Sequence, residues 1–219
     1  MHNVLILGDQ HRPFEHPDYL KFCKDTYKRY NCNKVVNIGD EWDNCALSRF
    51  DKDPEGMTAK DEYEAALDAS KAWYKAFPTQ QVVESNHGLR PFKTAFVAGL
   101  PKVYMKSYSE FTKAPKGWTW HTHVVIDGVL YFHGEPFSGE SGHIRAMMKH
   151  RRSVVIGHIH AFAGVNYSQS AHDQLFAMNV GCGINDKTFP FNYAKNQATR
   201  PVLGCGVVLK GKEAIFVPM

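Results

Sequence analysis

The chain of 219 residues lacks a long apolar run, a Cys-x-x-Cys pair, and any repetitive or biased tract. An odd number of cysteines, five, argues against a disulfide framework, and their spacing does not match a zinc finger. We therefore expect a reducing, cytoplasmic location. The apolar run from Val4 to Leu7 is too short for a secretion signal or a membrane span, so we expect a soluble protein without a membrane partner. The net charge of +4 selects no partner by itself.

Short apolar runs alternate with helical stretches in the first part of the chain. Strands are expected at residues 4–7, 35–38 and 81–84, with helices at 17–30 and 58–77 between them. Thr58 is the expected cap of the second helix, which stops before Pro78. This β-α-β-α-β order predicts right-handed crossovers and a parallel sheet.

The second half is expected to consist mainly of strands. They are predicted at residues 118–126, 129–133, 154–156, 175–180, 202–209 and 214–217. Asp127-Gly128 is a strong signal for a hairpin turn. One remaining helix is expected at 139–150, and residues 101–116 and 185–201 are expected to be loops. With no visible boundary, we expect a single domain spanning residues 1–219, of the α/β class with two packed sheets.

Acidic, amide and imidazole side chains follow five of the predicted strands. In chain order they are Asp9 and His11, Asp40 and Asp43, Asn86 and His87, His133, and His158 and His160. The carboxyl ends of strands in an open α/β sheet share one edge, where ligands bind. Five separate segments are therefore expected to deliver oxygen and nitrogen ligands to one rim.

These donor types suit divalent metal ions of intermediate hardness. Carboxylate, amide and imidazole groups without thiolate fit manganese, iron, zinc or nickel better than calcium. Two ions about 3.5–4 Å apart need an anionic bridge, which a carboxylate at a sharp turn supplies. We expect two divalent metal ions as cofactors, with Mn²⁺ first and Fe, Zn or Ni as alternatives.

Read in order, the five segments resemble the motif set of the calcineurin-like metallophosphoesterase superfamily. They are Gly8-Asp9-Gln10-His11, Gly39-Asp40-Glu41-Trp42-Asp43, Ser85-Asn86-His87, His133-Gly134 and Gly157-His158-Ile159-His160. The segment Asn179-Val180-Gly181-Cys182 is similar to a stretch that often follows the last motif, and the likeness runs from about residue 3 to 183. The resemblance implies two packed mixed β-sheets flanked by helices, a four-layer α/β/β/α sandwich.

The resemblance also implies a role for each position. Metal ligands would be Asp9, His11 and His160 at the first ion, Asn86, His133 and His158 at the second, and Asp40 at both. The catalytic residues would be His87, facing the leaving-group oxygen, and Asp43, orienting that imidazole. The implied reaction is hydrolysis of a phosphate ester by a hydroxide that bridges the metal ions, without a covalent intermediate.

The chain departs from the family pattern at three positions. Ser85 stands where the family usually has glycine, and Gly88 stands where an acid often follows, so we expect altered loop geometry with activity retained. Asn44 stands after Asp43 in place of a phosphate-binding arginine, which argues against a protein serine/threonine phosphatase.

Other interpretations of these residues remain open at this stage. Gly-Asp pairs commonly form turns, and Asp43 as a helix N-cap competes with its catalytic role. The sequence His121-Thr122-His123 repeats the His-x-His spacing, but it lies in a predicted strand with aromatic neighbours and is interpreted as structural.

The expected function is phosphodiester hydrolysis, with nucleic acid or nucleotides as candidate substrates. Phosphomonoester hydrolysis is the alternative, and a non-catalytic protein-binding module is a third hypothesis. Arg90 is the expected substrate contact, and the region around it resembles compact phage and bacterial members likened to DNA-repair exonucleases. Further basic and aromatic residues near the motifs suggest nucleic-acid binding, against the competing interpretation of a solvated helix face and core aromatics. They are Lys93, Arg145, Lys149, Arg151, Arg152, Phe132 and Phe137.

Overall fold

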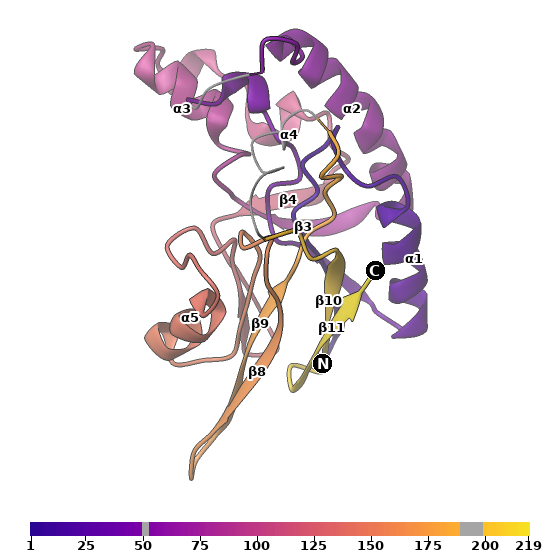
Figure 1. Ribbon diagram of the computed structural model, residues 1–219, viewed down its shortest axis with the longest axis vertical. Coiled ribbons are helices and arrows are strands. Elements are labelled where there is room, and N and C mark those ends of the chain that lie inside the picture. The colour runs from indigo at the N-terminus through magenta and orange to yellow at the C-terminus, as the bar shows by residue number, and fades with distance from the viewer. Residues whose placement is uncertain (50–52, 189–198) are drawn as a thin grey trace.

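Two mixed β-sheets packed against each other, with helices on their outer faces, make up the fold (Figure 1). The computed structural model describes residues 1–49, 53–188 and 199–219. This is the predicted fold class, α/β with two mixed sheets in four layers.

The first sheet contains six strands in the order β11-β10-β1-β2-β3-β4. They are β1 (Asn3–Leu7), β2 (Lys34–Asn37), β3 (Thr79–Val83), β4 (Gly117–His121), β10 (Gly204–Leu209) and β11 (Glu213–Pro218). Strands β1 to β4 are parallel, as the alternation of strands and helices predicts, while β10 and β11 add an antiparallel edge.

The second sheet contains five strands in the order β5-β6-β7-β9-β8. They are β5 (Val124–Ile126), β6 (Val129–Tyr131), β7 (Val154–Ile156), β8 (Ala163–Gln169) and β9 (Gln174–Val180). Strands β6, β7 and β9 are parallel. The predicted Asp127-Gly128 turn joins β5 to β6, and both residues have the positive φ that such a two-residue turn requires.

Helices α1 (Tyr19–Arg29) and α2 (Ala59–Ala76) cover the first sheet, and α5 (Gly142–His150) covers the second (Figure 1). Thr58 caps α2 as predicted, because its side chain accepts a hydrogen bond from the Asp61 amide. Shorter helical segments lie outside these layers: α3 (Arg90–Val97), α4 (Tyr108–Phe111), and the 3₁₀ turns η1 (Cys45–Leu47) and η2 (Lys102–Tyr104). No described helix is long and apolar enough to cross a membrane.

Each interface between layers has its own apolar core. Side chains of both sheets meet in a central cluster that includes Ile6, Val36, Tyr131 and Met178. A second cluster, built around Trp73, lies between the first sheet and helices α1 and α2. A third cluster lies under α5. Burial on two faces explains why residues 4–7 of β1 and all of β7 are continuous apolar runs rather than alternating ones.

Several sequence predictions about these elements were wrong. Residues 118–126 do not form one strand, because the chain leaves the first sheet after His121 and enters the second at Val124. Strand β8 was missed, since its exposed edge position is filled by weakly strand-forming residues. The helix predicted at 139–150 is confirmed as α5, but it is not the one remaining helix, because α3 and α4 also form. Since α4 and η2 lie within residues 101–116, that segment is not a plain loop. The predicted loop 185–201 lies partly outside the described residues.

Candidate metal centre

The candidate site lies where strands of both sheets end. In the first sheet, the loop after β1 carries Asp9 and His11, the loop after β2 carries Asp40 and Asp43, and the loop after β3 carries Asn86 and His87. The loops after β6 and β7 of the second sheet carry His133, His158 and His160. The five segments therefore meet at one edge, as predicted from their positions after strands.

Three of the candidate ligands have left-handed backbone conformations. The φ angles are 53° at His11, 48° at Asp40 and 67° at His158. Non-glycine residues rarely adopt this conformation, and strain of this kind concentrates at functional sites. The turn before Asp40 needs a glycine, because a Cβ at Gly39 would lie 2.6 Å from Cβ of Ser85.

The first set of donors consists of Asp9, His11 and His160, whose ligand atoms lie within 4.8 Å of one another. Oδ2 of Asp9 lies 3.0 Å from Nε2 of His160 and accepts a hydrogen bond from the His158 amide at 2.8 Å. The other oxygen, Oδ1, is buried and has no hydrogen-bond partner among the described residues. An orphaned carboxylate oxygen in such a cluster fits a metal ligand.

The second set consists of Asp40, His133 and His158, whose ligand atoms also lie within 4.8 Å of one another. Asn86 joins this set, because its Oδ1 lies 2.8 Å from Nε2 of His133. The structure thus brings together all seven residues predicted as metal ligands.

Asp40 belongs to the second set and also forms a third group with His11 and His87, whose ligand atoms lie within 4.8 Å of one another. Its Oδ2 lies 3.3 Å from Nε2 of His133, 3.6 Å from Nε2 of His11 and 4.0 Å from Nε2 of His87. The residue is buried, with 1% of its surface exposed. One carboxylate facing both donor sets is the arrangement that a bridging ligand requires.

Hydrogen-bond partners at Nδ1 of two imidazoles orient the other ring nitrogen, Nε2, toward the centre. Nδ1 of His133 lies 3.0 Å from the carbonyl oxygen of Ile38, and Nδ1 of His11 lies 3.1 Å from Oδ1 of Asp43. Metal-binding histidines commonly donate one N–H to a carbonyl or carboxylate, which leaves the other nitrogen as a ligand. The sequence did not reveal either partnership, since only the folded chain brings these groups together.

His87 and Asp43 form a pair at the rim of the centre. Nδ1 of His87 lies 2.5 Å from Oδ1 of Asp43. Arg90 closes this pair: its Nη1 donates to the Asp43 carbonyl at 3.0 Å, and its Nη2 lies 3.2 Å from Nε2 of His87. The N-cap of η1 is Asn44, so the interpretation of Asp43 as a helix cap was wrong.

The imidazoles keep the central acids ionised. Burial alone would raise the pKa of the Asp40 carboxyl, but His133 and His87 outweigh it and hold this pKa well below its usual value. Burial also raises the pKa of Asp9, but the hydrogen bond from His160 and the charges of His133 and His160 together outweigh burial and lower it. Burial lowers the pKa of His133, yet Asp40 acts more strongly and raises it to about 9. The centre therefore presents carboxylates, the form that binds metal ions.

The two unusual residues of the third motif support the loop geometry. The Ser85 hydroxyl accepts hydrogen bonds from the Asp40 amide at 2.7 Å and the Gly88 amide at 3.4 Å. A family-type glycine at position 85 has no such group. Gly88 packs against Tyr108, whose hydroxyl would lie 3.2 Å from a Cβ at this position. Ser85 thus ties the turn that carries Asp40 to the loop that carries His87.

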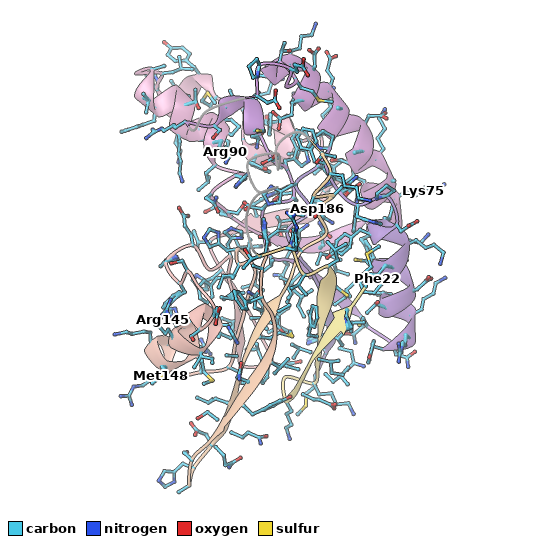
Figure 2. All side chains as sticks on the ribbon, in the orientation of Figure 1. Phe22, Lys75, Arg90, Arg145, Met148 and Asp186 are labelled. Atoms are coloured by element: carbon cyan, nitrogen blue, oxygen red, sulfur yellow. The ribbon has the colours of Figure 1, made fainter. Side chains whose placement is uncertain are left out.

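Other candidates lie apart from the centre. His121 ends β4 and His123 is exposed, in agreement with a structural role. Arg145 lies on α5, well separated from Arg90, and bonds the Ser138 carbonyl (Figure 2). Lys93 faces Glu135 at 3.8 Å. The predicted stacking residues Phe132 and Phe137 pack on the core beneath α5, which favours the interpretation as core aromatics.

No family model matches the chain, and no curated protein matches it in sequence. Among solved structures it is similar to Vps29 from Chaetomium thermophilum, with 11% identity over 94% of this chain and 84% of that one and a TM-score of 0.46. A Vps29 mutant from Entamoeba histolytica has 11% identity over 97% and 88% of the two chains, with a TM-score of 0.44. A zinc complex of wild-type Vps29 from the same organism has 13% identity over 97% and 88%, with a TM-score of 0.42. Similarity at this level supports no conclusion about function, so the proposals below rest on the geometry.

Proposed function

We propose that this chain is a metallophosphoesterase of the calcineurin-like type, a dinuclear metal-dependent hydrolase of phosphate esters. The observation that carries the proposal is the buried Asp40 carboxylate, which faces one donor set through His11 and the other through His133. Phosphodiesters are the proposed substrates, with nucleotides or nucleic acid as the candidate class and phosphomonoesters as the alternative.

The residues fit two divalent ions of the manganese, iron, zinc or nickel type. Asp9, His11 and His160 would hold one ion, Asn86, His133 and His158 the other, and Asp40 both. Bound ions supply positive charge that stabilises the phosphoryl oxygens and lowers the pKa of the attacking water.

His87 is the proposed proton donor to the departing oxygen. Burial and the charge of Arg90 lower the pKa of its imidazole, but Asp40 and then Asp43 outweigh them and raise it, which favours the protonated form that donates. The contact between Nδ1 and Asp43 fixes the ring and leaves Nε2 toward the centre. His87 is partly exposed, with 18% of its side-chain surface accessible, so substrate can reach it.

Arg90 is proposed to bind the part of the substrate that carries the departing oxygen. Its guanidinium lies beside Nε2 of His87 and is also partly exposed. An oxygen that approaches His87 would therefore meet a fixed positive charge. Because Arg90 also bonds Asp43, we expect its loss to affect both the position of His87 and substrate affinity. The compact phage and bacterial subtype remains a prediction from the sequence.

The test compares bis-p-nitrophenyl phosphate with p-nitrophenyl phosphate as substrates for the manganese-loaded protein. We expect diester turnover, a loss of about 10²–10³-fold or more in kcat for Asp40→Asn, and fewer than two bound ions in that variant. The matched control is Asp68→Asn, an exposed acid on α2 that should leave both readouts unchanged. A preference for the monoester would support the alternative substrate class.

A second variant separates metal binding from proton donation. His87→Gln should keep both ions and lose about 10²–10⁴-fold in kcat. A protein that binds no divalent ion, or an Asp40→Asn variant with full turnover, would contradict the proposed function. Two bound ions without turnover of either ester, together with partner binding that survives Asp40→Asn, would favour a protein-binding module.

A further inference from the structure

A separate cavity of about 660 Å³ lies behind the loop that carries His87. It is bounded by the end of β3, the edge strand β4 and the segment from α3 to α4, and none of the seven candidate metal ligands lines it. Its volume falls in the range of pockets for small molecules. Glu41 and Ser85 line its inner part and are both buried.

Two polar groups in this cavity suit a ligand. The carboxyl of Glu41 accepts a hydrogen bond from Nε1 of Trp120 at 3.0 Å. The hydroxyl of Tyr108 is buried beside the Glu41 carboxyl, but it makes no hydrogen bond of good geometry with a described residue. Buried polar groups are normally well paired, so a hydroxyl that lines a cavity and is poorly aligned with its neighbour has bonding capacity left for a ligand.

Aromatic side chains form the cavity wall around Glu41 and the Tyr108 hydroxyl. The ring of Tyr108 lies 5.3 Å from that of Trp120 and 6.1 Å from that of Phe92, measured between centroids. Leu89 and Met105 complete the apolar lining. Such walls favour a flat ring system over a flexible chain.

The outer part of the cavity carries both basic and acidic side chains. Lys102 and Lys106 line it and are exposed, as are the acids Glu84 and Glu110. Glu110 is held by the Ser107 amide at 2.9 Å and by the Ser107 hydroxyl at 2.5 Å in the cap of α4. The two lysines therefore provide a binding position for an anionic substituent such as phosphate.

We infer that this cavity binds an adenine nucleotide at a site distinct from the metal centre. The exocyclic amine of adenine donates to Glu41, a ring nitrogen accepts from the Tyr108 hydroxyl, and the phosphate lies near Lys102 and Lys106. Trp120 donates to Oε1 of Glu41, and the carboxyl keeps acceptor capacity for the amine. Guanine has a carbonyl oxygen where adenine has this amine, and in the same orientation that oxygen would face the Glu41 carboxyl. The adenine ring packs against the aromatic side chains of the cavity wall.

The test uses adenosine, AMP and guanosine as probes of the full chain after metal removal with a chelator. Adenosine has no phosphate, so a metal-centre ligand cannot explain its binding. We expect calorimetry to detect adenosine binding, with AMP about threefold or more tighter at low salt and guanosine about tenfold or more weaker. Tyr108→Phe should weaken adenosine about tenfold, while its melting temperature should change little, because the lost hydroxyl is poorly aligned with Glu41 in the free protein.

The matched control is Tyr104→Phe, an exposed tyrosine of the same segment that does not line the cavity, and it should bind adenosine normally. A second variant, Lys106→Gln, should weaken AMP and leave adenosine unchanged. The inference is overturned if adenosine does not bind at millimolar concentration, if guanosine binds equally well, or if Tyr108→Phe binds like the unmodified chain. Because the protein is free of metal throughout, these results are independent of the proposed hydrolase activity.

Discussion

Buried carboxyl groups in this protein fall into two kinds, according to their neighbours. Imidazoles surround Asp9 and Asp40 and keep them ionised despite burial. Glu15 and Glu41 lie instead in the aromatic region around Arg12, where burial dominates and raises the pKa of each. The same residue class therefore has its pKa lowered by neighbouring imidazoles at one place and raised by burial at another.

Glu15→Gln tests the second kind. Burial raises the pKa of Glu15 to about 7 against the opposing charge of Arg12, so folding favours the protonated form. The resulting stability is full below the unfolded pKa of 4.5 and is lost as pH rises through about 7. Gln keeps an acceptor for Nε1 of Trp73 and cannot ionise. From about pH 5 to about pH 8 we expect the variant to gain on the order of 2 kcal/mol relative to the unmodified chain.

Urea unfolding of both proteins at the two pH values measures this gain. The control is Glu64→Gln, which replaces an exposed glutamate on α2. Its free energy of unfolding should change between the two pH values by the same amount as that of the unmodified chain. Equal pH dependence of Glu15→Gln and the unmodified chain would show that Glu15 is ionised in the folded protein.

At the scale of elements, α2 supports the two loops that carry Asp9, His11 and Asp40. The Ser70 hydroxyl accepts hydrogen bonds from Nη1 of Arg12 at 2.8 Å and from Nε1 of Trp42 at 2.9 Å. Glu62 accepts from the Cys45 and Ala46 amides at 2.6 and 2.7 Å. The helix thereby fixes the chain just after His11 and just after Asp40, so its stability bears directly on the site.

Thr58→Ala tests this role of α2. The Thr58 side chain accepts from the Asp61 amide at 3.2 Å, and without it the first turn loses one satisfied donor. We expect a loss of about 1 kcal/mol in the free energy of unfolding. Thr58→Ser, which keeps the hydroxyl, is the matched control. Denaturant unfolding should separate the two variants, and equal stabilities would contradict a capping role.

At the scale of the whole molecule, the candidate centre joins the two sheets. Loops after β1, β2 and β3 of one sheet and after β6 and β7 of the other contribute ligands. An ion held by these residues would bind the native arrangement of both sheets and would have no equivalent site in the unfolded chain. Metal affinity and global stability are therefore expected to be linked.

Thermal unfolding of the chelator-treated protein measures this linkage. At an Mn²⁺ concentration about a hundredfold above its Kd we expect a gain of about 2.7 kcal/mol, or roughly 5–10 °C in Tm for a chain of this size. Ca²⁺ should give a smaller shift, because imidazole donors suit it poorly. Equal shifts for both ions, or none for Mn²⁺, would contradict a nitrogen-rich metal centre.

Much of the fold was predictable because its signals are local. Short β-branched runs closed by Gly-Asp marked β1 and β2, and Thr58 with the apolar stripe after it marked α2. The missed elements also had usable signals: Ser107 and Glu110 form a capping box, and Pro91 lies in the first turn of α3. Strand β8 had none, since its pairing with β9 stabilises it rather than its own composition.

The sequence by itself determined which residue types follow which strands, and so which atoms are available for metal binding. Tertiary structure alone decided their partners: Asp43 serves both His11 and His87, Arg90 closes that pair, and Ser85 ties two motifs together. It also placed Glu41 and Tyr108 on one cavity although 67 residues separate them. The physical reason is that propensities and turns depend on neighbours in the chain. Burial, hydrogen-bond partners and pKa depend on contacts between segments far apart in it.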